Sequence, residues 1–182
     1  MTATATATKL PTGTWNLDPV HSSVGFEVPY LVGIFRGQFT KVAAQLRVTE
    51  DGTAELDGET PVSSIRVQDE NLNGHLLAPD FFDAEQFPTL SFSAKQIVVE
   101  GSEVVARGEL TIKGVTHQVE ARGTLSGPAP DAYGNERLGL VLRSNIDRTA
   151  FGIEWNAPLP NGEPALSNDV TIVTELYFVK EA

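Results

Sequence analysis

Cysteine is absent from this 182-residue chain, and histidine is scarce, with three residues. Without cysteine the chain cannot form a disulfide, a thiolate nucleophile or a cysteine metal site. His21, His75 and His117 are scattered along the sequence and lack the short His-x-x-x-His or Glu-x-x-His spacing of helical metal sites. Glycine-rich phosphate loops of the Walker type and a Gly-x-Ser-x-Gly elbow are also missing. We therefore expect no metal and no cofactor.

Positive charge and long apolar runs are in short supply as well. Thirteen Lys and Arg residues face 24 Asp and Glu residues, which gives a formal net charge of −11. Such an acidic chain repels nucleic acid, so nucleic acid is not an expected partner. No window approaches the roughly 20 apolar residues of a membrane-spanning helix. The N-terminus also lacks the basic start and apolar stretch of a secretory signal. These absences predict a soluble, cytoplasmic protein without stable membrane insertion.

The domain organisation follows from length and local composition. Alternating Thr and Ala at the start predict a disordered tail over residues 1–12. Residues 13–180 are expected to form one domain, which is long enough to bury a full core.

What the chain has in abundance is an apolar pattern of period two, which is typical of β-strands. Apolar residues alternate with polar ones over 24–28, 44–48, 54–60, 90–99, 104–112, 115–125, 138–146 and 170–178. Asp51-Gly52, Glu100-Gly101 and Lys113-Gly114 stand between these segments as hairpin turns. The pattern predicts an all-β fold, an antiparallel barrel of about eight strands. The alternation changes phase around Thr40–Val42, which suggests a bulge in one long strand.

Two features interrupt this pattern. Residues 69–78 carry Leu72, His75 and Leu76 at helical spacing after an acidic start, and Pro79 ends the element, so we expect one short helix there. Together with Phe81-Phe82 it is expected to cover one end of the barrel. Glycines also stand inside four strands, where they indicate either strong curvature or clearance for a ligand; they are Gly58, Gly108, Gly123 and Gly139.

Four motifs resemble the YceI-like family of bacterial polyisoprenoid-binding, lipocalin-like proteins. They are the Trp15–Phe26 opening (WNLDPVHSSVGF), His75-Leu76 with Asp80–Asp83 and Phe87-Pro88, the Gly108–Thr116 hairpin (GELTIKGVT), and Ile146–Ile153 (IDRTAFGI). The motifs follow the family's order and span nearly the whole chain. One departure is visible, because Leu72 and Asn73 stand where many members carry Arg-Asp.

The resemblance implies a non-catalytic protein with an extended barrel around an apolar tunnel, often dimeric. The implied ligand is a polyisoprenoid, an isoprenoid quinone or a fatty-acyl-like chain. An alternative is a stress-related structural or interaction module whose barrel is packed and binds no small molecule. Sequence alone does not separate a hollow barrel from a filled one, since apolar stripes also form cores. A homodimer finds further support in the Phe81-Phe82 pair, which looks exposed.

Residues for the tunnel can still be named. The expected apolar lining is Phe26, Phe39, Phe81, Phe92, Leu110, Leu140, Leu142, Ile146, Phe151 and Ile172. The expected polar end, which would meet a head group, is His21, Ser22, His75 and Arg148. Structural roles compete with these assignments: Arg148 also fits an ion pair with Asp147, Glu154 or Asp18, and the histidines fit capping or burial. Asp18, His21 and Ser22 can be written as a catalytic triad, but neighbouring strand side chains point to opposite faces, so no enzyme is predicted.

Overall fold

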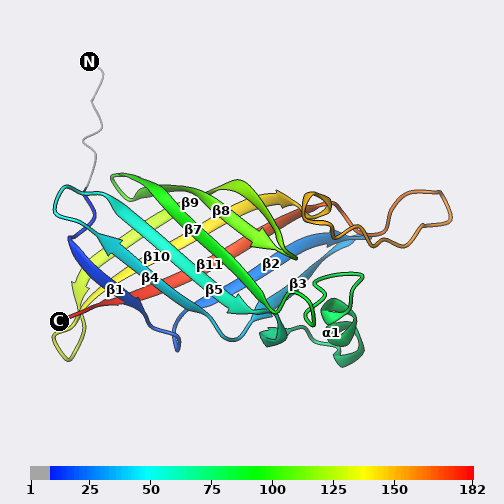
Figure 1. Cartoon of the computed structure of the whole chain (residues 1–182), viewed down its shortest axis with the longest axis horizontal. Helices are drawn as coiled ribbons and strands as arrows, with labels where there is room; N and C mark the ends of the chain where they lie inside the picture. The colour runs from blue at the N-terminus through cyan, green and yellow to red at the C-terminus, as the bar shows by residue number, and fades with distance from the viewer. Residues whose placement is uncertain (1–8) are drawn as a thin grey trace, which may run out of the picture.

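The computed structural model describes residues 9–182, which form one antiparallel sheet with a single α-helix (Figure 1). The strands are β1 (Gly13–Leu17), β2 (Ser23–Tyr30), β3 (Gly33–Phe39), β4 (Ala43–Val48), β5 (Ala54–Pro61), β6 (Ile65–Arg66), β7 (Thr89–Glu100), β8 (Glu103–Ile112), β9 (Val115–Pro130), β10 (Glu136–Asp147) and β11 (Asp169–Lys180). The helical elements are α1 (Glu70–Leu77) and the short 3-10 turns η1 (Val62–Ser64) and η2 (Arg148–Phe151). The predicted all-β class with one short helix is confirmed.

Eight of the strands close a barrel in the order β1-β4-β5-β7-β8-β9-β10-β11, because β1 pairs with both β4 and β11. Strands β7 to β10 follow one another as hairpins, and residues 148–168, which include η2, lead from β10 to β11. The Lys113-Gly114 turn has positive φ at both residues, the conformation that suits a two-residue hairpin. Closure removes the free edges that would otherwise expose unpaired backbone groups.

The last strand, β11, has a different partner along each half. Thr171–Glu175 pair with β2, whereas Phe178–Lys180 pair with β1. Strand β2 then pairs with β3, and the end of β3 pairs with β6, which follows β5 through η1. Next to the Thr171–Glu175 half of β11, the barrel wall therefore consists of β2, β3 and β6 instead of β1 and β4.

This arrangement corrects the expectation of one long bulged strand through Thr40–Val42. Strand β3 ends at Phe39 and β4 starts at Ala43, and the two belong to different parts of the wall. At Thr40–Val42, where the alternation changes phase, the chain leaves the part of the wall that contains β3 and enters the part that contains β4. The observed bulges lie elsewhere, between Ala94 and Gln96 and between Arg137 and Gly139.

Helix α1 lies below one end of the barrel, on the side opposite the chain termini (Figure 1). Asp69 caps it by accepting a hydrogen bond from the backbone N–H of Leu72 at 2.9 Å. The helix ends at Leu77, ahead of Pro79, and buries Leu76 beneath it. The predicted helix over 69–78 is confirmed, together with its place at a barrel end.

The interior contains two clusters of buried side chains. One surrounds Trp15, Leu140 and Phe178, none of which is exposed, in the half of the barrel closed by β1. The other surrounds Phe39, Ile65 and Phe151, in the half closed by β2, β3 and α1. The molecule thus has a tightly packed half around Trp15 and a second half around Phe39, each with its own cluster of buried side chains.

Part of the expected N-terminal tail, residues 1–8, lies outside the described residues. Leu10 is buried in the first cluster, and the carbonyl of Pro11 accepts a hydrogen bond from the Trp15 indole at 3.0 Å. The packed core therefore reaches back beyond the expected domain start at residue 13.

Candidate ligand-binding cavity

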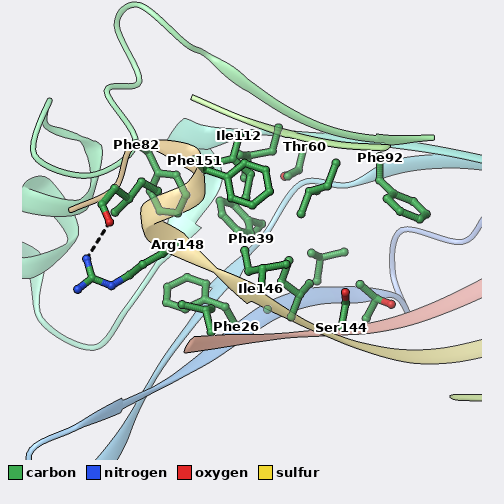
Figure 2. A pocket seen from close by; sticks show the side chains of 18 of the residues that line it. Phe26, Phe39, Thr60, Phe82, Phe92, Ile112, Ser144, Ile146, Arg148 and Phe151 are labelled. Atoms are coloured by element: carbon green, nitrogen blue, oxygen red, sulfur yellow. Dashed lines mark hydrogen bonds between the residues drawn. The ribbon is translucent and has the colours of Figure 1, made fainter. Parts of the chain in front are cut away.

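The second half of the barrel contains a cavity of about 350 Å³. This volume falls within the range of small-molecule sites, roughly 300–1,000 Å³. Its walls come from inward-facing residues of the strands, and nearly all the exposed lining atoms are apolar. Figure 2 shows Phe26, Phe39, Phe82 and Phe151 around one end of it, with Phe92 and Ser144 farther along. The packed cluster around Trp15 forms the floor beyond them.

The cavity exists because small residues stand at inward positions. Ala44 lies opposite Gly58 on β4 and β5, and Ala121 faces inward on β9. A Cβ built on Gly58 would meet the Ala44 methyl at 3.5 Å and the Ala43 carbonyl oxygen at 3.6 Å, both ordinary contacts, so this glycine leaves space. A Cβ at Gly108 or Gly123 would instead lie within 2.2 Å or 1.7 Å of a backbone oxygen on the next strand. Clearance therefore explains Gly58, whereas Gly108 and Gly123 are explained by the close approach of the next strand, a reason that neither expectation contained. Gly139 leaves room for the Tyr177 ring, which would lie 3.2 Å from its Cβ.

Inward-facing residues on β2, β10 and β11 are only partly buried, although they point into the barrel. Phe26, Ile146 and Ile172 belong to this group. Partial exposure of an inward side chain reflects the unfilled space in front of it. The lining residues Tyr30 and His75 also have exposed faces on the molecular surface, which places an opening of the cavity between the β2–β3 hairpin and α1.

Aromatic rings surround the opening. The His75 ring makes edge contacts with Phe81 and Trp155, at centroid distances of 4.9 and 5.1 Å, and those two rings are 5.3 Å apart. Deeper inside, Phe82 meets Phe39 edge-on at 6.0 Å. Phe81 is buried and Phe82 is half-buried, and both line the cavity. This corrects the reading of Phe81-Phe82 as an exposed pair that supports dimerisation.

Arg148 borders the same end of the cavity, but its guanidinium is bonded to the protein (Figure 2). It donates to the carbonyl oxygens of Ser167, Ile153 and Trp155 at 2.8 to 2.9 Å. Longer bonds reach the Leu166 carbonyl and the Asn168 side chain, at 3.5 and 3.4 Å. The residue is 4% exposed, and burial lowers the pKa of its guanidinium.

These contacts correct the expectation that Arg148 forms an ion pair. No carboxylate within residues 9–182 lies in salt-bridge contact with it, and Asp18 pairs with Arg137 and His21 instead. All five N–H donors of Arg148 have an acceptor in the segment 153–168, so the side chain fixes that segment at the cavity mouth. The negative charge of Asp147, its neighbour in the chain, partly offsets the effect of burial on the pKa of Arg148.

Two hydroxyl groups of the lining are likewise occupied by internal hydrogen bonds. The Thr60 hydroxyl donates to the Lys41 carbonyl, and the Ser144 hydroxyl donates to the Glu120 carbonyl at 2.8 Å. Neither hydroxyl keeps its proton for a ligand. This lining favours a ligand held by apolar contact and shape.

Of the expected lining residues, the structure places nine at the cavity and one away from it. Phe26, Phe39, Phe81, Phe92, Leu110, Leu142, Ile146, Phe151 and Ile172 line it. Leu140 is fully buried in the packed half and does not. Among the expected polar residues, His75 and Arg148 lie at the cavity mouth.

His21 and Ser22 lie away from the cavity. His21 is exposed and bonds Asp18 at 2.7 Å, while the Ser22 hydroxyl exchanges hydrogen bonds with the backbone of Tyr177. The bonds from His21 and Arg137 lower the pKa of Asp18 to about 2. Asp18 and His21 are thus bonded, but Ser22 turns to another strand, and the three do not form a nucleophile–base chain.

Sequence reasoning missed Trp155, Leu72 and Tyr30, which line the mouth. Trp155 stands in an irregular segment with no periodicity to assign a face. Its only mark in the sequence is that it is one of two tryptophans. Residues 9–182 hold no group of three His, Cys, Asp or Glu side chains placed to bind a metal ion. They also include no helix long and apolar enough to cross a membrane.

A closed antiparallel barrel with an apolar internal cavity is the architecture of lipocalin-like proteins. The model of the YceI-like domain matches residues 15–178, and the chain belongs to this family. A UPF0312 protein of Staphylococcus aureus (strain USA300) is 30% identical over 171 residues, covering 90% of this chain and 96% of the relative.

Solved structures share the fold at lower identity. BcnA of Burkholderia cenocepacia superposes with a TM-score of 0.76 at 21% identity, over 88% of this chain and 98% of that one. A polyisoprenoid binding domain from Saccharophagus degradans, implicated in plant cell wall breakdown, superposes with a TM-score of 0.68 at 12% identity, over 92% and 98% of the two chains.

Proposed function

We propose that this protein binds an apolar chain of the isoprenoid, isoprenoid-quinone or fatty-acyl class in the barrel cavity and carries or stores it without chemical change. The observation that carries the proposal is the cavity of about 350 Å³ with its almost wholly apolar lining. Membership of the YceI-like family supports it. The polyisoprenoid binding domain of Saccharophagus degradans, which has the same fold, supports the ligand class.

Burial energetics suit such a ligand. Each buried CH₂ contributes about 0.8 kcal/mol, so a few isoprene units give a large gross gain, which ordering and association costs reduce. The packed-barrel alternative requires an interior filled throughout, and the cavity counts against it. The expected homodimer and cytoplasmic location now rest on the family resemblance and on composition, since Phe81 and Phe82 face inward.

Bound lipid can be tested directly. The purified protein is extracted with organic solvent and the extract is analysed by mass spectrometry; in parallel, an isoprenoid quinone in detergent micelles is offered to the delipidated protein. We expect either co-purified apolar lipid or quinone uptake of about one molecule per chain. Finding neither would overturn the proposal.

Two variants at adjacent positions test whether the ligand binds in the cavity. Ile146→Asp puts a carboxylate into the cavity, whereas Asn145→Asp puts one on the exposed outer face of the same strand. A charge in an apolar site is costly, so quinone uptake should decrease at least about tenfold in the first variant and stay unchanged in the second. Circular dichroism checks that both variants fold. Equal uptake by folded Ile146→Asp protein would place the ligand elsewhere.

A further inference from the structure

Six consecutive residues at the tip of the β2–β3 hairpin, Pro29–Ile34, are exposed and uncharged; we call them the mouth hairpin. Within it Val32 is completely exposed, and Tyr30, Leu31 and Ile34 are 42%, 55% and 52% exposed. Residues 9–182 contain seven large apolar side chains with such exposure, and the other three, Val20, Val98 and Tyr133, are scattered. Single exposed apolar residues are common, whereas a cluster indicates a contact surface.

The mouth hairpin lies at the open end of the barrel. The backbone of Tyr30 pairs with Leu166, and the Leu31 N–H donates to the Ala165 carbonyl at 3.0 Å. This ties the hairpin to the segment 157–166, which projects beyond the same end (orange in Figure 1) and carries one charged residue, Glu163. Tyr30 itself lines the cavity. Apolar surface therefore continues from the tip into the interior.

A charged belt marks where this apolar surface stops. Glu27 and Arg36 face each other across the hairpin and form an ion pair at 3.3 Å, and Arg143 joins Glu27 at 3.1 Å. No residue from 28 to 35 is charged. Four residues of strand beyond the belt extend about 13 Å. That length is comparable to the depth of about 5–10 Å at which amphipathic elements lie in a bilayer surface.

The small size of the mouth hairpin and the net charge of the protein indicate what kind of partner it contacts. Four exposed apolar side chains are far fewer than the roughly 20–30 residues per side of a stable protein interface, so a second copy of the chain fits poorly. Shallow insertion into lipid needs only a few apolar side chains. The net charge of −11 disfavours an anionic surface.

We propose that the mouth hairpin inserts into the surface of a zwitterionic phospholipid bilayer with no net charge, and that an apolar chain passes between the bilayer and the cavity at this contact. The inference rests on the proposed function for its cargo. Contact at the cavity mouth spares the chain a passage through water, so transfer to and from vesicles occurs by collision with the lipid surface.

The test uses the full-length protein and phosphatidylcholine vesicles. Val32→Asp places a charge at the tip, and Val98→Asp adds the same charge at an exposed apolar position on β7 outside the mouth. We expect wild type and Val98→Asp to float with the vesicles, and binding by Val32→Asp to decrease at least about tenfold. Binding should resist raised salt, and it should weaken when a third of the lipid is replaced by phosphatidylglycerol.

Quinone transfer from loaded vesicles gives the second readout. Its rate should rise with vesicle concentration for wild type and be at least about tenfold lower for Val32→Asp. Uptake from detergent micelles should be equal in all three proteins. Wild-type protein that takes up quinone from micelles but does not float, or a Val32→Asp variant that transfers at the wild-type rate, would overturn the docking inference alone. A dimer that Val32→Asp dissociates, without flotation, would also overturn it. Absence of quinone uptake from micelles and of co-purified lipid would instead refute the proposed function.

Discussion

At the scale of single residues, Arg148 organises the cavity mouth by bonding a chain segment that has no regular structure. Replacing it with Met would leave the carbonyls of Ser167, Ile153 and Trp155 buried without donors. A buried acceptor left without a donor typically costs about 1–3 kcal/mol. Because several acceptors are affected, we expect the free energy of unfolding, measured in urea, to decrease by at least about 2 kcal/mol. The control is Arg143→Met, which removes an exposed ion pair and should cost at most about 1 kcal/mol. Similar losses in both variants would contradict this role for Arg148.

Asp18 makes stability depend on pH. Its pKa is about 2 in the folded protein, below the usual value of 3.8, because His21 and Arg137 bond its carboxylate. A lowered folded pKa stabilises the protein above the unfolded pKa, and this contribution is lost as the pH falls from about 4 through about 2. Asp18→Asn should therefore be less stable than wild type at pH 7, by about 1 kcal/mol. The two urea-unfolding curves should converge towards pH 2; a constant difference across that range would contradict the assignment.

Single residues also show which parts of the site could not be predicted from the sequence. His75 and His21 both have a carboxylate within five positions, Asp80 and Asp18, and both resemble a polar end in the sequence. Only the closure of the barrel decides that one lies at the mouth and the other on an outer edge. For Arg148 the sequence left either a ligand head group or a carboxylate as the partner, but carbonyls of a non-periodic segment surround it, and no local pattern predicts such partners.

At the scale of elements, periodicity and turn chemistry predicted helix α1 and the strands β2, β4, β5 and β7 to β11, but not the short strands β1 and β6. These elements are determined locally, by alternation, by Asp69 as a cap and by Pro79 as a stop. The separation of β3 from β4 was not predictable in the same way. It depends on which partner each strand pairs with. In the sequence, the change of phase at Thr40–Val42 looks the same whether one strand bulges or one strand ends and another begins.

Helix α1 permits a matched test with glycines. A Cβ at Gly74 meets nothing within 4 Å, so Gly74→Ala should stabilise the helix by about 0.5–1 kcal/mol, through a lower entropy of the unfolded chain. Slower hydrogen exchange across residues 70–77 would report this. Gly108→Ala should instead destabilise the barrel, because its Cβ falls within 2.2 Å of the Ser93 carbonyl oxygen. If Gly108→Ala were tolerated, strand crowding would not be the reason for that glycine.

At the scale of the whole molecule, the central property is that one half of the barrel is packed and the other is hollow. Both halves are lined by the same kinds of alternating apolar residues, so the period of the pattern is identical in each. What differs is the summed volume of inward side chains across strands that are distant in sequence, as with Gly58, whose register partners are Ala44 on β4 and Phe92 on β7. Closure and class were therefore predictable, whereas the location of the empty half was not.

Enlarging one side chain in each half tests this division. Ile172 on β11 faces the cavity, and Leu140 on β10 is completely buried in the packed half. Ile172→Phe adds volume into open space, so the free energy of unfolding should stay within about 0.5 kcal/mol of wild type. Leu140→Phe overpacks a filled region and should cost about 1–3 kcal/mol.

Ligand uptake should respond in the opposite sense. Ile172→Phe narrows the cavity and should reduce quinone uptake from micelles, whereas folded Leu140→Phe protein should retain it because Leu140 does not line the cavity. A crystal structure of Ile172→Phe would show the added ring within the cavity. Equal destabilisation by both substitutions, with unchanged uptake, would mean that the two halves are equally packed in solution. The carrier function and the exchange at the mouth both depend on the hollow half. A ligand can enter and leave a cavity while the barrel stays folded, whereas side chains that fill a close-packed core cannot be displaced in this way.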